Sequence, residues 1–118
     1  MESGEILVVD DDDAIRETIA EVLELEHFVV KVARNGREGL TLIRGGLRPR
    51  LILLDLMMPV MNGWDFAREL AGDPALADIP ICVLTATGPT QPAPVDVVAT
   101  IRKPVRLDRL LEVVRQHC

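Results

Sequence analysis

Short apolar runs alternate with amphipathic segments along this chain of 118 residues. The runs are too short for buried helices, are rich in branched side chains, and are bounded by Gly, Pro or acidic residues. These features are typical of strands buried on both faces of a parallel sheet. The predicted strands are Glu5–Asp10, Phe28–Ala33, Leu51–Asp55, Ile81–Thr85 and a short strand within Val95–Arg102.

The amphipathic segments repeat apolar residues at spacings of three and four, which predicts helices with one buried face. The first helix begins with Asp12 or Asp13 as its N-cap, and Asn35-Gly36 opens the second, which ends at Gly45-Gly46. The third runs from about Asn62 to Leu70, and the last follows Lys103-Pro104. The positions expected to face the core are Ile15, Ile19, Val22, Leu23, Leu40, Ile43, Trp64, Ala67, Leu70, Leu107, Leu110, Leu111 and Val114.

Strands that alternate with helices across short loops predict an α/β fold with a doubly wound parallel sheet. The length fits a single domain, residues 1–118, with a core of about residues 5–115. The segment Gly88–Pro94 carries three prolines and cannot form an ordinary helix interior.

Composition narrows the function classes. The formal net charge is -6, which argues against direct nucleic-acid binding by this domain, because phosphates require a cationic surface. No apolar run approaches membrane-spanning length, and the N-terminus lacks the basic start of a signal peptide, so we expect no membrane insertion and a cytoplasmic protein. The two cysteines form neither a disulfide framework nor a metal-binding spacing.

Polar residues follow most of the predicted strands at their carboxyl ends. Parallel strands bring these ends to one edge, so we expect Asp10, Asp11, Asp55, Thr85 and Lys103 to lie together. Clustered carboxylates repel one another, and oxygen ligands alone favour Mg²⁺ over zinc. A carboxylate beside such a cation can attack phosphorus, while a lysine and a hydroxyl hold the phosphoryl oxygens. The pattern predicts a phosphoacceptor site on Asp55 with its own metal.

These motifs resemble the response regulator receiver domains of two-component signalling. The resemblance runs from Ile6 to about Val114 and rests on ILVVDDDD, LILLDLMMPVMNGWDF, VLTAT and RKP. It implies a flavodoxin-like sheet with strand order 2-1-3-4-5 and Mg²⁺ as cofactor, with Mn²⁺ as a possible substitute. It also implies that Asp11 binds the metal directly and Asp10 through water, that Asp55 is both phosphorylation site and ligand, and that the backbone carbonyl of Met57 completes the ligand set.

The resemblance assigns further roles near the carboxyl edge. Thr85 takes the position of the switch hydroxyl, Ala86 is the small residue that leaves room for the phosphate, and Lys103 is the phosphate-binding lysine. The peptide before Pro104 is commonly cis in this family. The implied activity is not that of a conventional enzyme, although receivers catalyse their own phosphorylation and slow dephosphorylation.

Two features depart from the family pattern. Thr100 occupies the position of the switch aromatic, three residues before Lys103, so no ring is available there. The span from Thr85 to Lys103 is shorter than usual, and its prolines replace most of the family's fourth helix. We therefore expect that helix to be distorted or missing between Gly88 and Ala99, and the output surface to be non-standard.

Three functions remain open. The first is a receiver phosphorylated by a sensor histidine kinase or phosphotransfer protein, with output through contact with an unknown effector protein, because no output domain follows in the sequence. The second is a receiver-like interaction module that signals independently of phosphate. The third is a phosphatase of the haloacid dehalogenase type, since Asp10-x-Asp12 resembles the opening motif of those enzymes.

Overall fold

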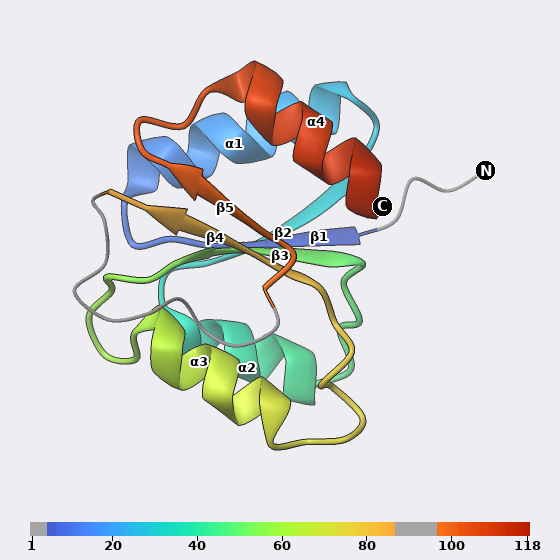
Figure 1. Cartoon of the computed structure of the whole chain (residues 1–118). Coiled ribbons are helices and arrows are strands. Elements are labelled where there is room, and N and C mark those ends of the chain that lie inside the picture. Colours follow the sequence, from blue (N-terminus) through green and yellow to red (C-terminus); the bar gives the residue numbers. More distant parts are fainter. Residues whose placement is uncertain (1–4, 87–96) are drawn as a thin grey trace.

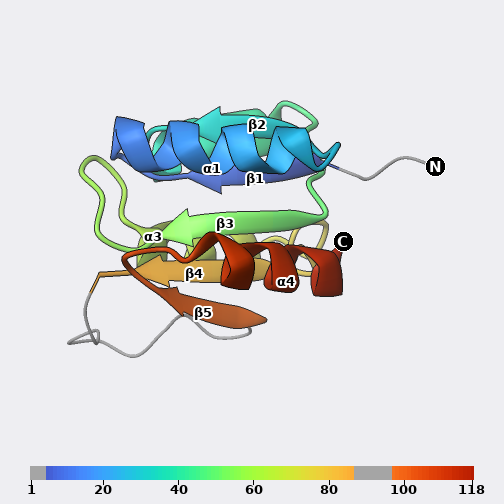
Figure 2. The same cartoon turned by 90° about the horizontal axis from the view of Figure 1, so that it is seen from above.

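A parallel sheet of five strands forms the centre of the computed structural model, which describes residues 5–86 and 97–118. The strand order is β2-β1-β3-β4-β5, as the resemblance implied, and every neighbouring pair is parallel. Figures 1 and 2 show that β2 and β5 form the two edges of the sheet. The strands are β1 (Glu5–Val9), β2 (Val29–Ala33), β3 (Leu51–Asp55), β4 (Ile81–Thr85) and β5 (Ala99–Arg102).

Helices cover both faces of the sheet. The described residues form α1 (Asp13–Leu25), α2 (Gly36–Arg44), α3 (Gly63–Ala71) and α4 (Leu107–His117). Helices α1 and α4 lie on one face, and α2 and α3 lie on the other (Figure 1). Side chains of Asp12, Asn35 and Asn62 cap the first three helices by accepting hydrogen bonds from backbone N–H groups.

Side chains that alternate along the strands divide the core into two layers. On β3, Leu54 and Ile52 pack in the layer beneath α2 and α3 together with Phe66, which is fully buried. Leu51 and Leu53 pack in the layer beneath α1 and α4. Both faces of the central strands are therefore buried, which explains why their sequences are continuously apolar instead of alternating.

Three sequence expectations need comment. Leu107 was expected to face the core, but it is 39% exposed in the first turn of α4, whereas Val113, further along that helix, is buried and was not predicted. Phe66 was not among the predicted core residues. The predicted loss of a helix between Gly88 and Ala99 falls largely on residues 87–96, outside the described residues.

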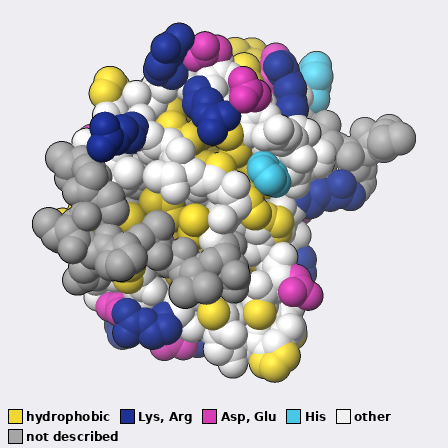
Figure 3. Space-filling model, viewed as in Figure 1, with side chains coloured by type: hydrophobic (Ala, Val, Ile, Leu, Met, Phe, Trp, Pro, Cys, Tyr) yellow, Lys and Arg dark blue, Asp and Glu magenta, His cyan; other side chains and the backbone are white. Residues whose placement is uncertain are grey.

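The outer surface of α4 mixes charges of both signs, as the upper part of Figure 3 shows. Ion pairs between Arg106 and Asp108 and between Arg109 and Glu112 account for part of this pattern. Within residues 5–86 and 97–118, no helix combines the length and the apolar character needed to cross a lipid bilayer.

Candidate functional site

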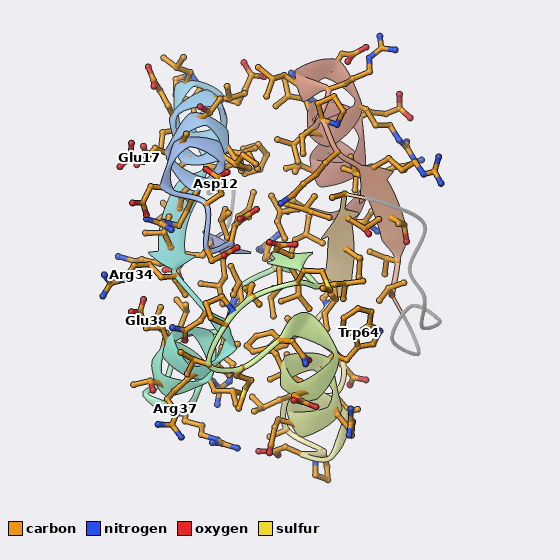
Figure 4. The ribbon with its side chains drawn as sticks, turned by 90° about the vertical axis from the view of Figure 1, so that its left-hand side faces the viewer. Asp12, Glu17, Arg34, Arg37, Glu38 and Trp64 are labelled. Carbon is orange, nitrogen blue, oxygen red and sulfur yellow. The ribbon has the colours of Figure 1, made fainter. Side chains whose placement is uncertain are left out.

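The parallel pairing of the strands brings the polar residues at their carboxyl ends to one edge of the sheet. Val9 lies opposite Leu54, so Asp10 follows β1 beside Asp55 at the end of β3. Asp55 lies opposite Leu84, which places Thr85 one residue further along β4. Thr85 in turn lies opposite Arg102, so Lys103 comes directly after β5. Figure 4 looks onto this edge, with Asp12 at the start of α1 and Trp64 on α3.

Three carboxylates converge at this edge. Asp10, Asp11 and Asp55 each offer an oxygen, and these oxygens lie within 4.8 Å of one another. Asp10 and Asp55 are buried, whereas Asp11 is exposed. Asp10 Oδ1 accepts a hydrogen bond from the Asp12 N–H at 2.9 Å, but Asp10 Oδ2 accepts no aligned hydrogen bond from the described residues. A fully buried carboxylate oxygen of this kind requires a cation nearby to compensate its charge.

Lys103 brings a positive charge to the acidic group. Its Nζ lies 3.2 Å from Asp10 Oδ2 and 3.4 Å from Asp55 Oδ2, and only 15% of its side chain is exposed. Burial alone would lower the pKa of Lys103, but the charges of Asp55 and Asp10 outweigh it and raise that pKa. The ammonium is therefore held in its charged form between the two buried carboxylates.

Burial and the Asp10 charge raise the pKa of Asp55 to about 7, against the opposing effects of Lys103 and the Met57 N–H. The Met57 N–H donates to Asp55 Oδ1 at 3.3 Å, while Met57 as a residue is 70% exposed. One lysine thus compensates only part of the repulsion between buried acids. This imbalance is what a divalent cation would relieve.

Four further residues were predicted at or near the site: Thr85, Ala86, Pro104 and Thr100. Thr85 is buried at the end of β4, and its carbonyl accepts the Lys103 N–H at 2.7 Å; Ala86, which follows, is exposed. The Lys103–Pro104 peptide bond is cis. Thr100 is exposed within β5, opposite Val83, and does not reach the carboxyl edge.

Two residues near the site were missed by sequence reasoning. Gly63 begins α3 directly against β3: a Cβ there would lie 2.6 Å from the Asp55 carbonyl oxygen. Arg16 is buried on α1, and its Nη1 donates to the Asp10 carbonyl at 2.8 Å. A usable signal for Arg16 existed, because it shares a helical face with Ile19 and Leu23, where a charged residue requires partners.

Comparison with known proteins identifies a single family. A family model described as the response regulator receiver domain matches residues 6–115. The chain is 46% identical over 83 residues to the response regulator MprA of Mycolicibacterium vanbaalenii and 48% identical over 81 residues to the DNA-binding response regulator MtrA of Mycolicibacterium smegmatis. Each match covers 69% of this chain and 34% of the relative, so the matched part spans about a third of these relatives' length.

Solved structures agree in fold. A response regulator receiver protein from Pseudomonas putida superposes with a TM-score of 0.86 at 29% identity, covering 95% of both chains. The receiver domain of a signal transduction histidine kinase from Syntrophus aciditrophicus gives a TM-score of 0.84 at 31% identity, covering 96% of this chain and 88% of the other.

Proposed function

Because this chain belongs to the family of response regulator receiver domains, we propose that Asp55 is the residue that accepts a phosphoryl group. The observation that carries this proposal is the convergence of Asp10, Asp11, Asp55 and Lys103 at one edge of the sheet. Asp55 is the central member of this group, because β3 lies between β1, which leads into Asp10 and Asp11, and β5, which leads into Lys103.

The donor set fits Mg²⁺, with Mn²⁺ as a substitute. All the available ligands are oxygens, and among the described residues one ammonium, that of Lys103, lies beside the two buried carboxylates of Asp10 and Asp55. We propose that Asp11, Asp55 and the Met57 carbonyl would bind the ion directly and Asp10 through water. When bound, the ion supplies charge neutralisation for the phosphoryl oxygens.

Each side chain then has its own role in phosphoryl transfer. An Asp55 carboxylate oxygen attacks the phosphorus of a phosphohistidine, and the new P–O bond forms as the P–N bond breaks. The leaving imidazole keeps the electron pair of that bond and takes up a proton. Lys103 pairs with one phosphoryl oxygen, and the Thr85 hydroxyl donates to another. This makes the chain a signalling phosphoacceptor and not a conventional enzyme.

The surface beside the site suits a protein donor. An apolar groove of about 270 Å³ lies between α1 and the segment that leads into α4, lined by Ile15, Thr18, Pro104 and Val105 among others. Since Pro104 adjoins Lys103, a donor seated there would hold its histidine close to Asp55. The proposed partner is accordingly a sensor histidine kinase or a phosphotransfer protein, and the expected cytoplasmic location is part of the same proposal.

Incubation with acetyl phosphate and MgCl₂ tests the proposal. Intact-mass spectrometry should detect one phosphoryl adduct on the wild-type chain that hydroxylamine removes, because acyl phosphates are cleaved by that nucleophile. The adduct should be absent in Asp55→Asn and retained in Asp108→Asn, a matched change on the surface of α4. Equal labelling of Asp55→Asn, or no adduct on the wild-type chain, would refute the assignment.

The alternatives differ in their tests. The exposed position of Thr100 keeps a phosphate-independent interaction module under consideration; that function predicts effector binding unaffected by beryllofluoride, a phosphoryl mimic. The phosphatase hypothesis is disfavoured, because the Asp12 carboxylate accepts hydrogen bonds from the N–H groups of Ala14 and Ile15 as a helix cap. It predicts turnover that Asp10→Asn abolishes.

The output of the whole protein is a separate proposal. The relative named MtrA is a DNA-binding response regulator, and the matched part of this chain covers only a third of it. If the natural protein continues beyond these residues, its output would include DNA binding by another region. The expectation that nucleic acid is not bound directly applies to these 118 residues alone.

A further inference from the structure

Arg16 is a buried cation beside the acidic group, yet it touches none of the three converging carboxylates in the described hydrogen bonds. It lies in the second turn of α1 and is 8% exposed. Its Nη1 donates to the Asp10 carbonyl at 2.8 Å, and its Nη2 forms an ion pair with the Asp13 carboxylate. The guanidinium therefore spans the turn that joins β1 to α1.

The atom that Arg16 holds belongs to the peptide unit between Asp10 and Asp11. The orientation of this peptide sets the directions in which the two acidic side chains leave the backbone. On one side of the turn, the Asp10 N–H donates to the Ala33 carbonyl at 3.1 Å; on the other, the Asp12 N–H donates to Asp10 Oδ1. Arg16 supplies the remaining contact, to the carbonyl itself.

A hydrophobic role does not explain this side chain. Arg16 shares its helical face with Ile19 and Leu23, both fully buried, and an aliphatic residue there would avoid the cost of desolvating a charge. The planar guanidinium, in contrast, can donate to a carbonyl and a carboxylate at once, which neither an aliphatic side chain nor the compact ammonium of lysine does with the same geometry.

We propose that Arg16 is a positioning residue for the divalent cation: it fixes the Asp10–Asp11 peptide so that the acidic pair is oriented toward Asp55 before the ion arrives. This inference rests on the proposed function, because it concerns the same site. Partners that orient metal ligands without touching the ion commonly change affinity by about tenfold or more when they are removed.

The alternative roles of Arg16 predict different changes in cation affinity when the residue is replaced. If its positive charge were its main influence on the site, removing it would strengthen cation binding by reducing repulsion. If it served only to stabilise the fold, removing it would lower the melting temperature and leave cation affinity unchanged. A positioning role predicts weaker binding even though a repelling charge has been removed.

Titration of the full chain with MgCl₂ separates these roles, with calorimetry and Trp64 fluorescence as readouts. Both Arg16→Met and the charge-preserving Arg16→Lys should bind Mg²⁺ about tenfold more weakly than the wild-type chain. Arg115→Met and Arg115→Lys are matched controls, since Arg115 pairs with Glu26 on the exposed surface of α4, and both should leave the affinity unchanged.

The outcomes distinguish the inference from the function on which it rests. Unchanged or tighter binding in a folded Arg16→Lys chain overturns the positioning role while leaving the phosphoacceptor proposal intact. If Arg16→Met fails to fold by circular dichroism, Arg16→Lys alone decides, because its charge is that of the wild type. A wild-type chain that binds no Mg²⁺ overturns both proposals.

Discussion

Val60 holds a backbone conformation that valine rarely adopts. Its φ is +69°, in the left-handed region, and the neighbouring Met61 N–H donates to the Pro59 carbonyl at 2.7 Å across this tight turn. A β-branched side chain is strained there, at a cost of about 1–2 kcal/mol relative to a residue without a Cβ. Val60 is 74% exposed, so burial of its side chain offsets little of the strain energy.

Replacing Val60 with glycine should therefore raise the free energy of unfolding by about 1 kcal/mol. Urea denaturation measures the change. Val29→Gly is the matched control: Val29 is also exposed but lies in the extended backbone of β2, so the same substitution should destabilise the protein. Loss of stability in Val60→Gly would show that the turn is not strained.

Asp55 should make the metal-free protein less stable as pH rises. Its pKa is about 7 in the folded chain against an ordinary value of 3.8, so the folded state binds more protons than the unfolded state between about pH 4 and pH 7. Stability contributed by the protonated form is full below pH 4 and is lost as pH rises through 7.

Asp55→Asn should remove this dependence. In urea denaturation with EDTA, the variant should be more stable than the wild-type chain at pH 8, and the difference should shrink toward pH 4. A variant that is equally or less stable at pH 8 would contradict the raised pKa of Asp55.

At the scale of elements, α3 approaches β3 so closely that only glycine fits between them. A Cβ on Gly63 would lie 2.6 Å from the Asp55 carbonyl oxygen and 2.8 Å from Leu56 Cα, both backbone atoms. The Gly63 N–H also donates to the Leu56 carbonyl at 2.9 Å, which ties the start of the helix to the end of the strand.

Gly63→Ala should lower the free energy of unfolding by about 1–3 kcal/mol, because the helix must shift away from β3. Thermal or urea unfolding measures this. Gly72→Ala provides the comparison: a Cβ there meets nothing closer than 3.5 Å, and the backbone conformation is one that alanine adopts readily. That variant should be neutral or slightly more stable. Equal effects of the two changes would rule out a close contact at Gly63.

Sequence patterns predicted the elements better than the contacts between them. The strand positions and the helix starts near Asp12, Asn35 and Asn62 follow from local signals that act within a few residues. The strand order, in contrast, came from the family resemblance. The spacing of apolar residues failed at Leu107, because this side chain lines the groove beside α1 and does not pack in a core layer. The roles of Arg16 and Gly63 depend on distances between separate segments, which periodicity does not encode.

Near the site, too, the sequence predicted some features and missed others. The sequence predicted that Asp10, Asp55 and Lys103 lie at one edge of the sheet, because each follows a strand and parallel strands share a direction. The strain at Val60 was not foreseen, since the turn that demands a positive φ is set by the closure of the loop between β3 and α3.

At the scale of the whole molecule, the two core layers lie on opposite faces of one sheet and share its strands. Neighbouring residues of β3 point into different layers: Leu53 packs beneath α1 and α4, and Leu54 beneath α2 and α3. Among the described residues, Trp64 packs against the layer beneath α2 and α3, so we expect its fluorescence to report on that layer.

Leu53→Ala and Leu54→Ala should each lower the free energy of unfolding by about 2–5 kcal/mol. In both variants, urea transitions followed by Trp64 fluorescence and by far-ultraviolet circular dichroism should coincide, because damage to either layer unfolds the shared strands. A Leu53→Ala chain whose fluorescence transition stays at the wild-type midpoint would indicate that the layers unfold separately.

The register of the strands, in which Val9 lies opposite Leu54, Asp55 opposite Leu84 and Thr85 opposite Arg102, restricts how this chain can change in length. Removing a single residue inside β3 would turn Asp55 toward the opposite side of the sheet and present a leucine to its neighbours instead. We therefore expect insertions and deletions to be tolerated only in the connections between elements, because the acids and the lysine stay together only while each strand keeps its length.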